Sequence, residues 1–282
     1  MIMKPVLMIH GGAGKLVHQD QDKTRQALKK IYENAFEYLK HHSALEAVVY
    51  AVRLLEDCHL FNAGTGSKLQ RDGKARMSAS VMDGRSQKFS AVLNIENVKN
   101  PVQVATYLLH DHDSVLACHF ATQFAREKGF PPYNPVTAQR KKEWQEQRKG
   151  LPYGTVGAVV RDRLGHLAAA TSTGGKGLER LGRVSDSAMP AGNYANHKAA
   201  VSCTGIGEHI INEALASKIV VRVADGLSLK QAFQKSFREV TQNQHEIGAI
   251  GVDAKGTVCL AHSTPMIHVA YLNSKGKLVV LP

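Results

Sequence analysis

The sequence lacks the features that mark several common protein classes. Its 282 residues contain only four cysteines, Cys58, Cys118, Cys203 and Cys259, which are widely spaced and form no CxxC pair. This spacing argues against a disulfide framework and against a cysteine-based zinc site. Apolar runs fall far short of the roughly 18 residues that a membrane-spanning helix needs. The short apolar start, residues 1–5, lacks the long apolar stretch of a secretory signal. We therefore expect a cytoplasmic protein without a membrane partner.

Negative charge is also scarce, because 24 acidic residues face 36 basic ones and give a formal net charge of +12. Such a surplus raises the alternative of a nucleic-acid binder, whose signature is a steep loss of binding with salt. The basic residues are dispersed, however, and no basic stripe is interleaved with the aromatic residues that stack on bases. We interpret the surplus as a solvated surface and expect no nucleic-acid partner.

Several catalytic motifs are missing as well. The sequence has no HExxH zinc motif and no GxSxG nucleophile elbow. The glycine-rich stretch His10–Gly14, which we interpret as a turn after a strand, lacks the Lys-Ser/Thr ending of a phosphate-binding loop. We therefore expect no cofactor for the chemistry, and hydroxyl groups beside glycines remain as the candidate reactive groups.

The apolar pattern predicts helices and strands in blocks, which is typical of an α+β fold. Ser43 and Glu46 form a capping box before one helix, and Pro101 and Ser114 are expected to begin two others. By contrast, residues 130–150 show almost no apolar pattern, and we expect an exposed segment without regular structure, where chains are commonly cut. Further helices are expected at 28–39, 206–226 and 228–242, and strands at 6–9, 75–82, 89–95, 155–161, 166–172, 247–252, 258–262, 267–272 and 278–281.

The junction between this polar segment and the next apolar run is Gly154-Thr155. A threonine at a chain start combines a hydroxyl nucleophile with an α-amine that acts as its base. Thr155 gains that amine only if the preceding bond is cut. Gly154 favours such a cut because it tolerates a strained backbone. The alternative is an ordinary junction between a loop and a strand.

Other polar residues of the second half suit the same chemistry. Thr173 and Thr204 lie beside glycines near the ends of expected strands, and Gly205 precedes a helix whose first amides favour negative charge. Arg183 and Asp186 form a compact pair of opposite charges that suits the carboxylate and ammonium groups of an amino acid. A surface ion pair is the alternative interpretation.

Seven segments, which follow one another through most of the chain, resemble the signatures of the threonine-type asparaginase/isoaspartyl peptidase family. This family belongs to the N-terminal-nucleophile hydrolases, so the resemblance implies a four-layer αββα sandwich. The segments are His10–Gly14, Leu60–Gly64, Val81–Gly84, Gly154–Val159, Ala168–Gly175, Gly182–Ser187 and Ser202–Gly205.

The resemblance implies a single domain of residues 1–282 that cuts itself between Gly154 and Thr155. The products would be an α chain of residues 1–154, with a flexible linker at about 130–154, and a β chain of residues 155–282. It also implies a homodimer of such αβ units. The substrates would be L-asparagine and isoaspartyl dipeptides, both of which contain a β-aspartyl amide bond.

The resemblance further assigns roles to individual residues. Thr155 would be the nucleophile, Thr173 would orient it, and Asn62 would be a nearby hydrogen bonder. Thr204 and Gly205 would form the oxyanion hole and help to place the substrate. The substrate's carboxylate and amine would be held by Arg183 and Asp186. A structural sodium ion would be bound by the backbone carbonyl groups of Leu55, Glu56, Cys58 and Phe61.

The sequence also departs from the family pattern. Ser185 stands where relatives commonly have glycine, which would narrow the substrate site or change its loop. Segments 244–248 and 263–268 differ as well, so the choice between asparagine and isoaspartyl peptides stays open. A glycosylasparaginase-like amidase is the second candidate, although Gly154 and Val156 differ from the aspartate and isoleucine usual in those enzymes. An uncut relative that binds an amino acid without catalysis is the third.

Overall fold

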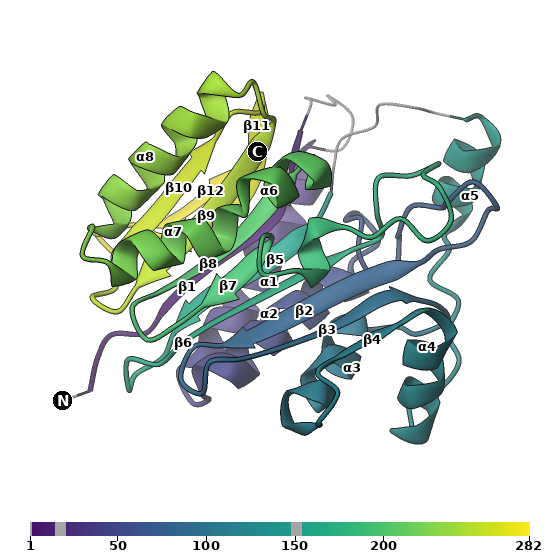
Figure 1. Ribbon diagram of the computed structural model, residues 1–282, viewed down its shortest axis with the longest axis horizontal. Helices are drawn as coiled ribbons and strands as arrows, with labels where there is room; N and C mark the ends of the chain where they lie inside the picture. The colour runs from purple at the N-terminus through teal and green to yellow at the C-terminus, as the bar shows by residue number, and fades with distance from the viewer. Residues whose placement is uncertain (1, 15–20, 148–153) are drawn as a thin grey trace.

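The computed structural model describes residues 2–14, 21–147 and 154–282. Two β-sheets lie face to face, and helices cover the outer face of each (Figure 1). The larger sheet has eight strands in the order β12-β11-β1-β5-β6-β2-β3-β4, and the smaller has four in the order β10-β9-β8-β7. All neighbouring strands are antiparallel except β3 and β4. This is the αββα sandwich that the resemblance implied, so the prediction of the fold class is confirmed.

The elements follow the order of the chain in blocks. The strands are β1 Val6–Gly14, β2 Met77–Asp83, β3 Lys88–Ile95, β4 Val115–Ala117, β5 Val156–Arg161, β6 Leu167–Thr173, β7 Asn193–Ala195, β8 Ala199–Gly205, β9 Ile247–Asp253, β10 Val258–His262, β11 Met266–Leu272 and β12 Leu278–Leu281. The helices are α1 Gln21–Leu39, α2 Ala44–Asp57, α3 Pro101–Tyr107, α4 Cys118–Glu127, α5 Ala138–Gln145, α6 Gly207–Glu213, α7 Leu215–Ala224 and α8 Leu229–Gln242, with short 3₁₀ turns at Leu108–His110 and Asp186–Ala188.

Three hydrophobic clusters fill the spaces between the four layers. One lies between α1–α4 and the larger sheet, one lies between the two sheets, and one lies between the smaller sheet and α6–α8. Strand β5 contributes to the first two, because Val156, Ala158 and Val160 face the helices whereas Val159 faces the smaller sheet. The strand that follows Thr155 is therefore buried on both faces, which fixes its position in the sheet.

Local sequence signals account for several helix ends. At the start of α2, Ser43 and Glu46 form the predicted capping box, in which each side chain bonds the other residue's backbone N–H. Pro101 begins α3, also as predicted. Among the described residues, the helices are too short or too polar to cross a membrane.

The prediction that residues 130–150 lack regular structure is wrong for α5. Thr137 caps this helix by accepting a hydrogen bond from the Arg140 N–H. The helix buries no residue of its own, but Arg140 Nε donates to the Gly66 carbonyl oxygen at 2.6 Å and Trp144 packs against Gly73. The helix is held by a hydrogen bond and by one aromatic contact. Neither contact requires apolar residues at helical spacing, so the sequence shows no helical pattern here. The part of the predicted linker at residues 148–153 lies outside the described residues.

Three other boundaries also differ from the predictions. Strand β1 continues through the glycine-rich stretch after His10, with an irregular register against β11, so this stretch is not a turn. Ser114 does not cap a helix, because a short strand follows it and α4 begins at Cys118. The helix expected over 206–226 is two helices, because Ala214 adopts a left-handed conformation (φ 46°) between α6 and α7.

Candidate active site

Thr155 lies immediately before β5, at the end of the strand where the glycine-rich loops converge. Its side chain is buried, and its hydroxyl donates a hydrogen bond to Thr173 Oγ1 at 3.2 Å. Thr173 Oγ1 also accepts the backbone N–H of Gly175 at 3.2 Å. Because β5 pairs with β6, the nucleophile candidate and Thr173 are neighbours across the sheet. Donation to Thr173 leaves the lone pairs of Thr155 Oγ1 available for attack on a carbonyl carbon.

His10 holds the backbone of Thr155. Its Nδ1 lies 3.1 Å from the Thr155 carbonyl oxygen, and its Nε2 lies 2.8 Å from Ser202 Oγ. Burial lowers the pKa of His10 to about 3, although the bond to Thr155 opposes this, so the ring is neutral. Since a carbonyl oxygen only accepts, Nδ1 carries the proton and Nε2 accepts from Ser202. Thr171 Oγ1, at 2.8 Å from Ser202 Oγ, then acts as donor in turn.

Asn62 holds the other side of the junction. Its backbone N–H donates to the Gly154 carbonyl oxygen at 3.2 Å, and its own carbonyl oxygen accepts the N–H of Gly174 at 2.8 Å. The side-chain oxygen of Asn62 accepts the N–H of Lys68 at 2.8 Å. A β-carbon on Gly154 would lie 2.7 Å from Asn62 Cβ, so this close approach requires glycine. The Gly154–Thr155 peptide bond is thus held on both sides, with its carbonyl oxygen already bonded to a donor.

The charged residues are paired differently from the prediction. Arg183 does not pair with Asp186 but binds Glu208 through two hydrogen bonds, from Nε at 3.1 Å and from Nη2 at 3.0 Å. Lys176 Nζ lies 3.1 Å from the same carboxylate. Burial opposes ionisation of Glu208, but Arg183 and then Lys176 outweigh it and lower its pKa to about 2. Glu208 is 25 positions from Arg183 along the chain, so the sequence did not predict this pairing.

Asp186 is buried, at 1% exposure, behind Ser185. Its Oδ1 accepts the Ser185 hydroxyl at 2.9 Å, whereas its Oδ2 has no hydrogen-bond partner among the described residues. Burial raises the pKa of Asp186 to about 6, and Ser185 and then Arg183 oppose that rise. Asp186 is therefore a buried carboxylate, mostly ionised at neutral pH, rather than a surface anion.

A small cavity joins most of the predicted site residues. Its volume is about 10 Å³, which is close to the space that one water molecule occupies by this measure. Thr204 does not line it, because its side chain faces β1 and accepts the Ala13 N–H at 3.1 Å. Asn62 lies behind Gly154. The residues lining the cavity are Gly154, Thr155, Thr173, Gly175, Lys176, Arg183, Ser185, Gly205, Gly207 and Glu208.

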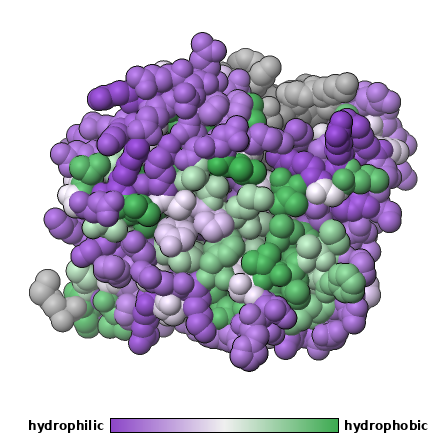
Figure 2. All heavy atoms as spheres, viewed as in Figure 1, coloured by the Kyte–Doolittle hydropathy of each residue, from purple (hydrophilic) through white to green (hydrophobic). Residues whose placement is uncertain are grey.

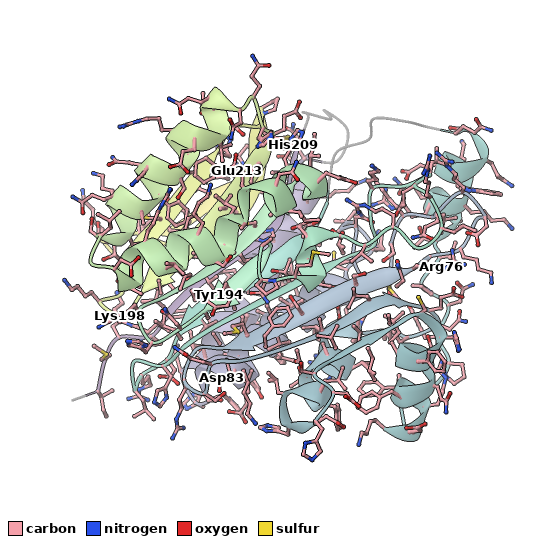
Figure 3. The ribbon with its side chains drawn as sticks, viewed as in Figure 1. Arg76, Asp83, Tyr194, Lys198, His209 and Glu213 are labelled. Atoms are coloured by element: carbon pink, nitrogen blue, oxygen red, sulfur yellow. The ribbon has the colours of Figure 1, made fainter. Side chains whose placement is uncertain are left out.

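A second polar cluster lies on α6, the helix that begins beside this cavity (Figure 3). The rings of His209 and His245 stack with centroids 4.4 Å apart, and His245 Nδ1 lies 2.9 Å from Glu213 Oε1. His209 Nδ1 accepts the backbone N–H of Glu246, so its proton is on Nε2. These contacts attach α6, and with it Glu208, to the loop that precedes β9.

The loop expected to bind sodium is compact. The carbonyl oxygens of Leu55, Glu56 and Cys58 each accept one backbone N–H, from Cys58, Thr65 and Phe61 respectively. The Phe61 carbonyl oxygen lies close to Gly66. Carbonyl oxygens are hard ligands with a second lone pair, so this donor set fits an alkali cation. Among the described residues, no group of three or more His, Cys, Asp or Glu side chains is arranged to hold a metal ion.

Comparison with known proteins places these features in a family. A model of the family described as asparaginase matches residues 3–281. The chain is 47% identical to an isoaspartyl peptidase/L-asparaginase of Synechocystis sp., over 95% of this chain and 88% of that protein. A protein of the same name from Nostoc sp. is 46% identical, over 95% and 92% respectively. A plant-type L-asparaginase of Pyrococcus abyssi is 37% identical, over 94% and 95%. Since the match extends over almost the whole chain, the resemblance of the seven segments is confirmed and the chain belongs to the asparaginase family.

Proposed function

We propose that the protein is a self-activating threonine hydrolase that cleaves β-aspartyl amide bonds. Its substrates would be L-asparagine, which yields aspartate and ammonia, and isoaspartyl dipeptides, which yield aspartate and an amino acid. The names of the relatives support this substrate class. The observation that carries the mechanism is the geometry at Thr155, whose buried hydroxyl donates to Thr173 while the preceding carbonyl oxygen accepts from Asn62.

Self-cleavage would begin with attack of Thr155 Oγ1 on the carbonyl carbon of Gly154. The Asn62 N–H would stabilise the developing oxyanion, since a preorganised donor in a buried site is worth several kcal/mol. The C–N bond then breaks, the α-amine of Thr155 takes up the hydroxyl proton, and Gly154 becomes an ester on Thr155. Water hydrolyses this ester, which releases a Gly154 carboxylate and restores the hydroxyl.

Cleavage would also open the substrate site. In the intact chain Gly154 lines a cavity of only about 10 Å³, too small for an amino acid. Withdrawal of the new C-terminus would create space beside Arg183, which would bind the substrate's carboxylate. Binding would require Arg183 to share its donors with Glu208.

The freed α-amine of Thr155 would then act as the base for amide hydrolysis. It would take the proton from Oγ1 as this oxygen attacks the side-chain carbonyl carbon of the substrate. Gly205, which lines the cavity, would stabilise the oxyanion, and Thr204 would join it if its hydroxyl turned from Ala13 toward the substrate. The leaving ammonia or amino acid takes a proton, an aspartyl ester remains on Thr155, and water releases aspartate. We propose that a sodium ion bound by the carbonyl groups of Leu55, Glu56, Cys58 and Phe61 would stiffen the nearby loop.

We further propose that the αβ unit forms a homodimer in the cytoplasm. Figure 2 shows an apolar region on one face of the molecule, over β2–β4, on the face of the larger sheet opposite to α3 and α4. Val115 in β4 is 45% exposed, and because its neighbour Leu116 packs on the helix side of the sheet, Val115 points to the opposite face. Sedimentation analysis tests this proposal: a Val115→Lys variant should shift a dimer toward monomer, and a monomeric wild type would contradict it.

The function is tested by intact mass and N-terminal sequencing of the wild type beside Thr155→Ala. We expect two wild-type fragments, one of which begins at Thr155, and a whole Thr155→Ala chain. Thr155→Ser is the matched control, because it keeps a hydroxyl and should still cut. Ammonia release from asparagine and amino-acid release from isoaspartyl dipeptides then measure turnover. A wild type that stays whole would refute self-activation and favour the non-catalytic relative.

A further inference from the structure

We propose that the Ser185 hydroxyl is a direct contact of the substrate's α-ammonium group, and that Asp186 acts through it as a positioning residue. The inference rests on the proposed function, because it assumes that an amino acid occupies the cavity beside Thr155. In this chain the side chain that contacts the amine would be Ser185 rather than Asp186. A glycine at this position, as in the family pattern, has no side chain that could make this contact.

The first observation is the order of the two side chains. Ser185 lines the cavity together with Thr155 and Arg183, whereas Asp186 is not among the described residues that line it. The Ser185 hydroxyl donates to Asp186 Oδ1 at 2.9 Å, so Ser185 connects the cavity lining to the carboxylate. A substrate entering the cavity would therefore meet the hydroxyl before the carboxylate.

The second observation is that the carboxylate has little room to turn. A β-carbon on Gly207 would lie 2.8 Å from Asp186 Oδ1, and one on Gly192 would lie 2.6 Å from Oδ2. The two oxygens are thus each packed against a glycine of a different segment. Asp186 is 1% exposed and closely packed, so its carboxylate would have to rearrange before it could contact a substrate directly.

The chemistry of the pair suits an ammonium ligand. The Ser185 hydroxyl donates its proton to Asp186 Oδ1, and its oxygen accepts the backbone N–H of Ser187 at 3.5 Å. A hydroxyl oxygen has two lone pairs, so one remains to accept from an ammonium group in the cavity. Hydrogen-bonded chains polarise one another, and the charge of Asp186 therefore strengthens this acceptor. A hydroxyl nevertheless binds an ammonium group less strongly than a direct carboxylate does. We expect moderate discrimination in favour of substrates that carry the α-amine.

The test compares two amides that differ only in this amine: L-asparagine, and succinamic acid, which lacks it. In the cut enzyme, Ser185→Ala should lower kcat/KM for asparagine by about tenfold to a hundredfold, the typical effect of losing a hydrogen bond to a charged group. For succinamic acid the change should be less than about threefold. Ser185→Gly uncovers Asp186 and should favour asparagine over succinamic acid more strongly than the wild type does. If both variants keep the wild-type ratio of the two kcat/KM values, the inference is wrong.

Binding of the two product acids, L-aspartate with the amine and succinate without it, separates this inference from the proposed function. Calorimetry on the cut protein should show that Ser185→Ala weakens the binding of L-aspartate by a similar factor and leaves the affinity for succinate almost unchanged. A cut wild type that hydrolyses neither amide but shows this pattern would refute the proposed turnover while supporting the Ser185 contact. Equal weakening of both ligands would overturn the contact, whatever the turnover. If Ser185→Ala fails to cut, Ser185→Gly provides the same comparison with the opposite sign.

Discussion

Replacing Glu56 by glutamine should change how the stability of the protein depends on pH. Glu56 is fully buried near the C-terminal end of α2. Its Oε1 accepts the Ser172 hydroxyl at 2.6 Å and the Val102 N–H at 3.0 Å, and its Oε2 has no partner among the described residues. Burial raises the pKa of Glu56 from 4.5 to about 8, although these bonds oppose the rise. Glutamine keeps the shape and the acceptor but cannot titrate.

The magnitude follows from proton linkage. Between pH 4.5 and about 8 the folded chain keeps a proton on Glu56 that the unfolded chain has lost. Its contribution to stability is thus fully present below pH 4.5 and falls as the pH rises through this window, by about 1.4 kcal/mol per pH unit. The whole window corresponds to about 4–5 kcal/mol. The free energy of unfolding of Glu56→Gln should rise relative to the parent by about this amount between pH 4.5 and 8.

The assay is urea unfolding at several pH values, in a Thr155→Ala background that keeps the chain whole. Glu33→Gln is the control, because Glu33 is exposed on α1 and surface substitutions usually change the free energy of unfolding by less than about 0.5 kcal/mol. Parallel curves for Glu56→Gln and its parent would refute the reasoning, because they would mean that Glu56 has the same protonation in the folded and unfolded chains.

Three further predictions concern the Gly154–Thr155 junction. Gly154→Ala should slow self-cleavage at least tenfold, because its β-carbon would displace Asn62 from the scissile carbonyl; a time course of fragment formation measures this, and an unchanged rate would contradict it. Gly157→Ala should lower the free energy of unfolding by about 2–5 kcal/mol, because its methyl group would overlap Ser202 Oγ and His10 Nε2. Urea unfolding measures this, and an unchanged midpoint would contradict the prediction. Because His10 has a pKa near 3, only the unfolded chain takes up its proton as the pH falls from about 6.5 toward 3, so the free energy of unfolding should fall in this range. His10→Gln should make this fall less steep, which acid titrations followed by circular dichroism measure.

The sequence was most informative where one local signal decides a structure. The capping box at Ser43 placed the start of α2. The apolar runs that follow Thr155 and precede Thr173 placed β5 and β6 nearly to the residue. It failed at α5, which has no buried face, and at Ala214, where the left-handed break carries no glycine or proline. In both places tertiary contacts decide the conformation.

The candidate site shows the same division. Gly154 and Thr155 could be found from the sequence because they are adjacent at a change of composition. His10 could not, because it reaches the Thr155 carbonyl across 145 positions. The partner of Arg183 was also missed, since any of several acids could satisfy a guanidinium and only the fold brings Glu208 to it. Pairings between distant polar groups are set by the packing of strands, which one sequence does not reveal.

If the chain is cut before Thr155, the strand order would determine how long the cut enzyme lasts. After a cut before Thr155, β1 from one product would lie between β5 and β11 from the other, and β2 would remain paired with β6. Neither product could leave without breaking central strands, and neither holds a complete core. Folding of the precursor involves one molecule, whereas refolding of the cut enzyme would require two fragments to meet and would depend on their concentration. Processing would therefore turn reversible unfolding into near-permanent loss, and the working life of each molecule would be set by how slowly it unfolds.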